Sequence, residues 1–181
     1  MRNKPVYVID IIRDVVAATQ TKVLAELQEA NPLIQSLNFI PGTPLEITDV
    51  LDVMAKQPTL ETKTFPLVGL FIPITENKGE AIGIDGIDRL RICIAMTSNA
   101  TIRTPERYTK NFKPILYPIY YEFLNQLDLD KRILKTDSNG FRHRKIDWPY
   151  YNPEGEKNAF NNFVDAIEIK DLELKIKLSN C

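Results

Sequence analysis

The sequence predicts an α+β fold, an antiparallel β-sheet of about four to five strands with helices packed mainly on one face. Apolar residues recur every three or four positions in the N-terminal third, which is typical of amphipathic helices. In the middle and near the C-terminus they form continuous runs or alternate with polar residues, as in strands. We expect one domain over residues 1–181, with N-terminal helices at 5–57, a strand hairpin at 65–98, a kinked helix at 104–127 and C-terminal strands at 141–178.

Two N-terminal helices are expected. The first spans residues 5–29, where apolar residues follow helical spacing, and Asn31-Pro32 ends it. The stretch NFIPGTP at 38–44 predicts a turn or a short extended segment, because Pro-Gly and Thr-Pro interrupt regular structure. The second helix spans residues 45–57.

A pair of antiparallel strands is expected next. Residues 65–74 are almost continuously apolar, which suits a strand covered on both faces. Residues 75–86 are polar and contain three glycines, so they predict a long hairpin loop. Residues 87–98 alternate, with Leu90 and Ile92 on one side and Arg91 on the other.

The segment PERYTKNFKPILYPIYYEFL at 105–124 combines a helical pattern with two internal prolines and six aromatic residues. Thr104 is expected to cap its start, with Pro105 in the first turn. A proline inside a helix costs about 3 kcal/mol, so we expect a break near Pro114. Residues 104–112 then form a short piece and 114–127 the main helix, with Tyr117, Tyr120 and Tyr121 free to reach a neighbour.

The C-terminal part predicts two strands separated by an irregular loop. Residues 141–147 form the first strand, and 148–162 read as a loop rich in proline, asparagine and aromatic residues. The chain closes with a strand at 164–178. The parity of its apolar residues shifts by one near Lys170-Asp171, which predicts a β-bulge there.

The composition bounds the class of protein. The chain is 44% hydrophobic and 26% charged with a net charge of −1, which suits a globular protein and excludes a general polyanion binder. Cys93 and Cys181 are too few for a disulfide framework, and Cys93 is expected in the core. We find no secretory signal and no run of about 20 apolar residues, so we expect no membrane and synthesis in a cytoplasm.

A small Mg²⁺-dependent nuclease is the alternative function considered. An acid-x-Lys strand with an upstream acid can hold the metal and assist the attacking water. Any amphipathic strand with alternating charges also yields this pattern on its solvent face, so we favour that interpretation. The residues that such a site requires are Asp147 or Asp165, Glu168 or Glu173, and Lys170 or Lys175.

Other candidate groups are weaker. His143, the single histidine, lies in a basic segment that we interpret as a solvated strand or loop. Four acids in or beside the predicted hairpin loop lack the spacing of a calcium-binding loop: Glu76, Glu80, Asp85 and Asp88. The aromatic residues of the kinked helix, with Trp148, Tyr150 and Tyr151, favour a protein interface over base stacking. We therefore predict no catalytic, cofactor-binding or metal-binding residues, no cofactor, and no enzymatic activity.

Several segments together resemble the tail terminators and related head–tail connector (neck) ring proteins of tailed bacteriophages, of the type found in phages of Bacteroidetes-like hosts. The distinctive parts are ERY-x₂-NF-x-PILYPIY and the closing DAIEI-x₂-LEL run. The matching segments are IDIIRDVV (9–16), TPLEITDVLDVM (43–54), FPLVGLFIPI (65–74), RICIAMTS (91–98), ERYTKNFKPILYPIYYEFL (106–124) and VDAIEIKDLELKIKL (164–178).

The resemblance implies a virion structural protein without catalytic residues. Copies are expected to join into a ring at the head–tail junction, commonly a hexamer, whereas related collars have twelve copies. The ring terminates the tail tube, contacts neck, portal-adaptor and tube proteins, and lets genomic DNA pass without sequence-specific binding. Segment 75–86 or the basic segment 142–145 is expected to project to the lumen or to a neighbouring ring. The expected location is the virion tail or neck, after synthesis in the host bacterial cytoplasm.

Overall fold

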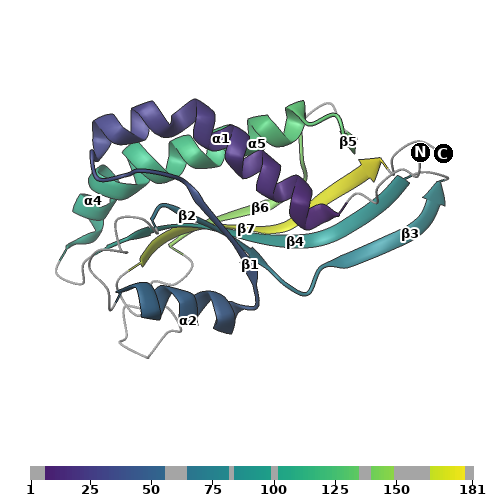
Figure 1. Cartoon of the computed structure of the whole chain (residues 1–181), viewed down its shortest axis with the longest axis horizontal. Coiled ribbons are helices and arrows are strands. Elements are labelled where there is room, and N and C mark those ends of the chain that lie inside the picture. The colour runs from purple at the N-terminus through teal and green to yellow at the C-terminus, as the bar shows by residue number, and fades with distance from the viewer. Residues whose placement is uncertain are drawn as a thin grey trace.

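The computed structural model describes residues 7–55, 65–81, 84–98, 102–134, 140–148 and 164–177. The predicted α+β class is confirmed: helices cover a curved β-sheet mainly on one face (Figure 1). Two long helical segments form that main layer, and one shorter helix lies against the opposite side of the sheet (Figure 1). The helical segments are α1 (Val8–Ala30), α2 (Pro44–Ala55), α4 (Thr104–Arg107), the π-helix η1 (Tyr108–Leu116) and α5 (Tyr117–Leu129). Helices α1, α4, η1 and α5 make the main layer, which we call the helix layer, and α2 lies on the other side.

The sheet has seven strands, and every pair that the described residues form is antiparallel except β1 with β2, so the sheet is mixed and larger than the predicted antiparallel sheet of about four to five strands. Two strands of 14 residues pair antiparallel at its centre, and shorter strands flank them in line. The strands are β1 (Asn38–Gly42), β2 (Leu67–Phe71), β3 (Thr75–Ala81), β4 (Ile84–Thr97), β5 (Ile133–Leu134), β6 (Arg144–Asp147) and β7 (Val164–Lys177).

Strand β1 makes the sheet mixed. It pairs parallel with β2, from Asn38 opposite Leu67 to Gly42 opposite Phe71. The segment predicted as a turn or short extended stretch is therefore a strand, and Pro41 is tolerated because β1 lies at the sheet edge. Gly69 of β2 fits because a Cβ there would lie 3.3 Å from the side chain of Ile47, which packs down from α2.

The expected antiparallel pairing of 65–74 with 87–98 is confirmed, because β2 pairs antiparallel with β4. The predicted loop at 75–86 is wrong: Thr75–Ala81 forms β3, and β4 already begins at Ile84. β3 continues the line of β2 along the same edge of β4. A polar segment with glycines is typical of a loop, but an outer strand such as β3 can have the same composition, because its polar residues face solvent.

Two register shifts bend the central pair of strands. One adds a residue to β4 between Ile87 and Leu90, where Arg89 has a φ of 58°. The other adds a residue to β7 between Ile169 and Leu172, where Asp171 has a φ of 55°. The β-bulge predicted from the parity shift near Lys170-Asp171 is therefore confirmed, and it keeps the apolar residues on both sides of it buried.

Helix α1 places its apolar stripe on the core, and its end at Ala30 agrees with the predicted stop at Asn31-Pro32. Helix α2 begins with a reciprocal capping box that we did not predict. The Glu46 amide donates to Thr43 Oγ1 at 3.2 Å, and the Thr43 amide donates to Glu46 Oε2 at 2.7 Å. The hydrogen bonds from Thr43 lower the pKa of the Glu46 carboxyl.

Helix α4 begins at Thr104 as expected, but Arg103 is the N-cap residue and makes no side-chain capping bond. The predicted break near Pro114 is absent, because α4, η1 and α5 run on as one helical segment. Nine residues adopt π-helical bonding, shown at its end by the Tyr117 amide, which donates to the carbonyl of Phe112. The wider π turn moves the proline ring away from the carbonyl four residues back, so the chain keeps Pro114 without a break.

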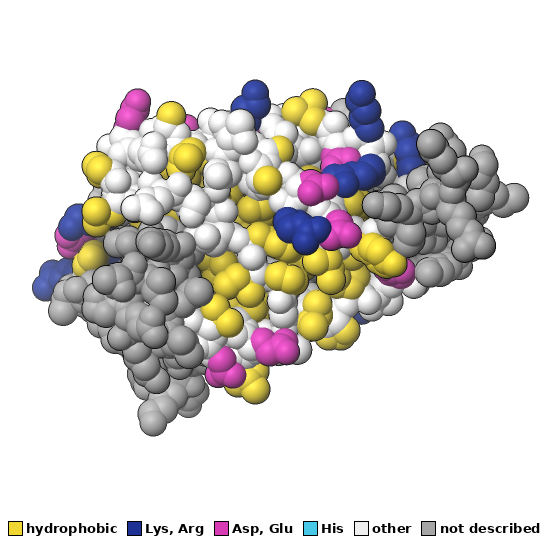
Figure 2. Space-filling model, viewed as in Figure 1, with side chains coloured by type: hydrophobic (Ala, Val, Ile, Leu, Met, Phe, Trp, Pro, Cys, Tyr) yellow, Lys and Arg dark blue, Asp and Glu magenta, His cyan; other side chains and the backbone are white. Residues whose placement is uncertain are grey.

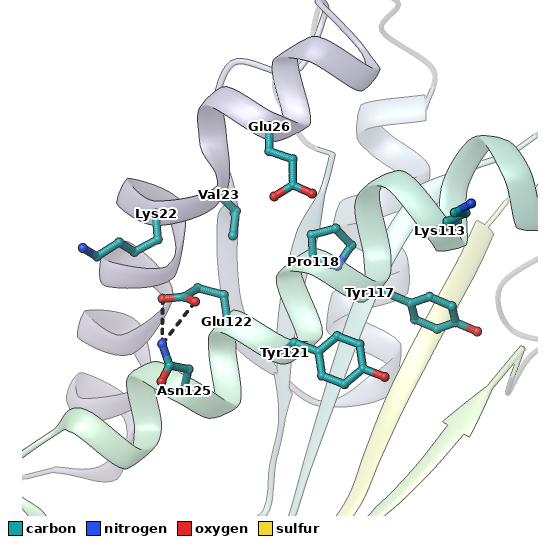
Figure 3. A pocket seen from close by; sticks show the side chains of 9 residues that line it. All are labelled: Lys22, Val23, Glu26, Lys113, Tyr117, Pro118, Tyr121, Glu122 and Asn125. Carbon is teal, nitrogen blue, oxygen red and sulfur yellow. Dashed lines mark hydrogen bonds between the residues drawn. The ribbon is translucent and has the colours of Figure 1, made fainter.

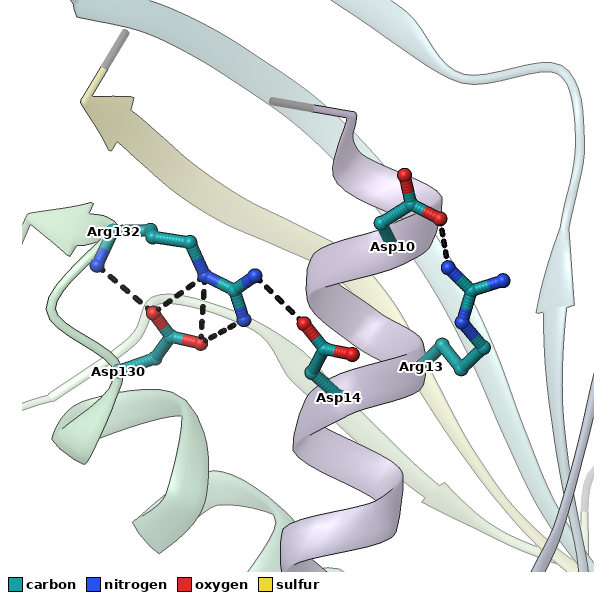
Figure 4. Close-up of polar contacts among 5 residues, drawn as sticks. All are labelled: Asp10, Arg13, Asp14, Asp130 and Arg132. Atoms are coloured by element: carbon teal, nitrogen blue, oxygen red, sulfur yellow. Dashed lines mark hydrogen bonds and ion pairs between the residues drawn. The ribbon is translucent and has the colours of Figure 1, made fainter. Parts of the chain in front are cut away.

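Arg132 ties the end of α5 to α1 (Figure 4). Its guanidinium donates to Asp130 Oδ2 at 2.6 Å and to Asp14 Oδ2 of α1 at 2.7 Å. Burial raises the pKa of the Asp130 carboxyl, but the hydrogen bonds from Arg132 outweigh it and lower that pKa overall. Asp10 and Arg13 form a second, exposed ion pair within α1.

Candidate assembly surface

A row of tyrosines lies on the outer side of η1 and α5, and we call it the tyrosine ladder: Tyr108, Tyr117 and Tyr121. The ring centroids of Tyr108 and Tyr117 are 6.2 Å apart, and those of Tyr117 and Tyr121 are 6.4 Å apart. Tyr108 is 42% exposed and Tyr121 is 64% exposed. Exposed tyrosines with apolar rings and polar tips are enriched at protein interfaces.

The ladder borders an open groove of about 580 Å³ between α1 and α5 (Figure 3). Tyr117, Pro118 and Tyr121 give it an apolar floor and side. Charged side chains of both signs stand around it, with Lys22 and Glu26 projecting from α1 and Glu122 from α5 (Figure 3). A groove that is apolar inside and mixed in charge at the rim is suited to another protein surface.

The inner side of the ladder is fixed to strand β6. Tyr117 donates its hydroxyl hydrogen to Asp147 Oδ2 at 3.0 Å. Lys145 donates to the same oxygen at 2.9 Å, and its ammonium lies 4.3 Å from the centre of the Tyr117 ring. Burial, together with the hydrogen bond to Asp147, raises the pKa of Tyr117 to about 12. These contacts hold Tyr117 in place as the middle of the ladder.

Tyr120 and His143 form a second link between α5 and the strand segment. The Tyr120 hydroxyl lies 2.7 Å from His143 Nε2, and His143 Nδ1 lies 2.8 Å from the carbonyl of Phe141. A carbonyl only accepts, so Nδ1 carries the hydrogen and Nε2 accepts from Tyr120 in the neutral ring. Burial, and then the nearby Tyr121 and Asp147, raises the pKa of Tyr120.

Two predictions change here. His143 is half-buried and hydrogen-bonded, so its interpretation as part of a solvated segment is wrong. Tyr120 is 6% exposed and Tyr117 is half-buried, so of the three tyrosines expected to be free only Tyr121 is. Tyr108 takes the place of Tyr120 at the surface. The positions of these rings depend on the π-helical turn, for which the sequence carries no recognised signal.

Asp165 forms a buried polar cluster with residues of α4 and η1. Its two carboxylate oxygens accept from Arg107 Nη1 at 3.1 Å and from Asn111 Nδ2 at 2.7 Å. Arg107 also donates from Nε to the carbonyl of Ile102, and Asn111 donates to that of Thr97. Every oxygen of the carboxylate therefore has a donor, which ties α4 and η1 to the central strands.

Glu168 forms a separate cluster on the opposite face of the sheet. It is almost fully buried and accepts two hydrogen bonds from Arg91, at 2.6 and 3.1 Å. Lys170 lies 3.3 Å from its other oxygen. The Arg91 guanidinium also covers the ring of Phe71 at 5.0 Å from its centre.

The sheet separates the residues proposed for the nuclease site. Asp165 lies opposite Met96 and Glu168 opposite Cys93 in an unshifted ladder, so their side chains point to opposite faces. Asp147 lies opposite Ile167, on the same face as Asp165. After the bulge, Glu173 and Lys175 alternate with buried Leu172 and Leu174, which places both of them on the Glu168 face. The two upstream acids and the Glu-x-Lys residues therefore do not converge.

Other candidate groups are only partly described. Cys93 is buried as expected, whereas Cys181, Tyr150 and Tyr151 lie outside the described residues. Trp148 packs on Phe112 with ring centres 4.0 Å apart. Glu76 is exposed, and the structure does not describe the side chains of Glu80, Asp85 and Asp88.

Within the described ranges, no three His, Cys, Asp or Glu side chains lie together as metal ligands do. None of the described helices is long and apolar enough to span a bilayer. No protein-family model matches the chain, and no curated protein matches its sequence.

Proposed function

We propose that the chain is a virion structural protein that forms a ring at the head–tail junction of a tailed phage. In this role it terminates the tail tube or connects it to the portal and neck. The proposal joins the resemblance of six sequence segments to the surface chemistry of the fold. The observation that carries it is the exposed tyrosine ladder, with its groove of about 580 Å³.

The ladder suits contact between copies for a physical reason. Tyr121 and Tyr108 present rigid apolar rings that lose little conformational entropy on binding, and the mixed charges of the groove rim supply orientation. A ring that closes needs heterologous contacts, in which one surface of a copy meets a different surface of the next. The ladder lies on one side of the fold only, so it supplies one half of such a contact.

The charged residues support a structural role in a second way. Asp165, Glu168 and Asp147 each bind basic side chains of the same chain. These carboxylates therefore link helices and strands to one another. The net charge of −1 also suits a channel through which DNA slides without strong attachment.

Electron microscopy of the purified protein, alone and mixed with tail tubes, tests the proposal. We expect closed rings in solution or rings bound to tube ends. A protein that stays monomeric in both samples contradicts the proposal. Cleavage of DNA that depends on Mg²⁺ and is lost in Glu168→Gln would establish the nuclease alternative in its place.

A further inference from the structure

We infer that neighbouring copies join by continuing one β-sheet from chain to chain, with the outer edge of β3 in one copy beside the outer edge of β6 in the next. This inference rests on the proposed function, because it adds to the tyrosine ladder a backbone contact between neighbouring copies of the ring. It assigns the partner of both segments as a second copy of this chain. The reasons are the accessibility of the two edges, their charges and their matching faces.

Strand β3 offers an open edge at one side of the sheet (Figure 1). Within the described ranges it pairs with β4 alone, over Thr75–Ala81. An outer strand presents backbone groups that can pair with another chain. β3 also contains no proline, so no amide is missing from its outer edge.

An apolar hollow of about 240 Å³ lies beside the start of β3. Its walls come from Tyr7, Val8 and Ile9 of the α1 region, from Ile72 and Ile74, which precede β3, and from Glu76 of β3. Hydrophobic side chains gather over the area between α1, β1 and β3 (Figure 2). An added strand gains main-chain hydrogen bonds from the edge and side-chain burial from such a hollow.

Strand β6 is the matching edge on the other side of the sheet. In the part of the chain that the structure describes, β6 pairs with β7 alone. The two remaining edge strands are poorer partners: β1 carries Pro41, and β5 has only two residues. An edge on each side of one sheet gives a head-to-tail contact, which is the type that closes into a ring.

The two edges differ in charge. Segment 75–81 contains two acids and one lysine, whereas 142–147 contains three basic residues and one acid. Opposite charge across an interface selects the partner and its register. The same difference disfavours β3 against β3 and β6 against β6, so the pairing of unlike edges is preferred over a two-fold dimer.

The faces of the two strands also match. Position 76 lies opposite Ile87, which lies opposite Leu174 on the helix-layer face. Lys145 lies opposite Ile169 and contacts the tyrosines of the helix layer, so it is on the same face. When the sheet continues with its helix layers on one side, an acidic position of β3 therefore meets a basic position of β6.

Cysteine cross-linking of the full chain tests the inference. Thr75→Cys and Arg144→Cys place one thiol on each edge, on the same face of the sheet and at exposed positions. Cys181→Ser in the same chain removes a competing thiol, while Cys93 stays buried. A short bismaleimide tolerates a small shift of register and traps weak contacts. The matched control keeps Thr75→Cys and replaces Arg144→Cys by Ala17→Cys, an exposed site on α1 that does not line the groove beside the tyrosine ladder.

We expect the variant with both edge cysteines to give a series of covalent dimers, trimers and higher species, while the control variant stays monomeric. Mixing the two single-cysteine chains should give dimers only, because each chain then has one reactive edge. Equal products from both pairs, or monomers from the edge pair, overturn the inference. Microscopy of the same samples separates the two claims. Rings without cross-linked species support the proposed function alone, and cross-linked species without rings support the sheet contact alone.

Discussion

At the scale of single residues, Asp165 has the strongest requirement for its partners. Its side chain is fully buried, and it meets the Arg107 guanidinium, which is itself 8% exposed. Two charges held away from water stabilise a fold only while both are present with their hydrogen bonds. The cluster therefore fixes where α4 and η1 meet the ends of the central strands.

Asp165→Asn should lower the free energy of unfolding by about 3–5 kcal/mol, because it leaves the buried Arg107 charge uncompensated. Urea or guanidinium unfolding followed by circular dichroism measures this change. Asp171→Asn on the same strand is the matched control, since the pair of Asp171 with Arg144 is exposed and worth at most about 1 kcal/mol. Equal losses in the two variants would contradict the structural role of the cluster.

Tyr117 gives the fold a pH dependence at high pH. Burial and the bond to Asp147 raise its pKa to about 12, from 10.0 for the unfolded side chain. Below pH 10 both states keep the proton, whereas between the two values only the folded state does. The stability that the protonated phenol contributes is therefore lost as the pH rises from about 10 to about 12.

Tyr117→Phe should remove that part of the alkaline loss of stability, measured as the free energy of unfolding at several pH values. Tyr108→Phe, an exposed position of the same ladder, serves as the control and should retain the wild-type slope. The interpretation fails when the two variants show the same dependence on pH.

At the scale of elements, the bulges and the π-helix decide how the sequence maps onto the fold. The parity of Ile167, Ile169, Leu172 and Leu174 was enough to predict the bulge at Asp171, because a buried face must stay apolar. The bulge at Arg89 left no such sign. The two residues between Ile87 and Leu90 are both polar, so the pattern of apolar residues does not reveal an inserted residue.

The helical segment from Thr104 to Leu129 could not be predicted correctly from local sequence rules. Proline rules predict a break, because they assume bonds between residues four apart. The chain changes instead to bonds between residues five apart, and Phe112 and Leu116 of this segment are fully buried in the core. The capping box of Thr43 and Glu46, by contrast, was visible in the sequence as Thr-x-x-Glu.

The bulge in β4 predicts a difference between two substitutions of Arg89. At a φ of 58° a β-branched side chain is strained and glycine is not. Arg89→Val should therefore be less stable than Arg89→Gly by about 1–2 kcal/mol in denaturant unfolding. In a regular strand valine is more favourable than glycine. If Arg89→Val were the more stable variant, the bulge would therefore be absent.

At the scale of the whole molecule, the class of the fold and the pairing of β2 with β4 followed from the sequence, whereas the site did not. The Tyr117–Asp147 and Asp165–Arg107 contacts join residues distant in the chain. Packing of α4 and α5 on the sheet, together with the register of β6 on β7, brings them together, and single-sequence periodicity gives neither. The same register keeps the acid-x-Lys residues apart from Asp147 and Asp165.

The tyrosine ladder predicts a separation of assembly from stability. Tyr121→Ser should weaken association between copies by about 2 kcal/mol or more, as for an aromatic residue at the centre of an interface. Its free energy of unfolding should stay near the wild-type value, because the side chain is 64% exposed. Sedimentation across a range of concentrations measures the association. Leu33→Ser, at a site of equal exposure outside the ladder, should associate like the wild type.

The proposed ring is the central claim, and imaging of particles tests it most directly. Purified full-length protein is examined by negative-stain electron microscopy, alone and after mixing with tail tubes. The account predicts closed rings with rotational symmetry, free or at the ends of tubes. Monomers in both samples, at concentrations where the chain is folded by circular dichroism, would contradict it.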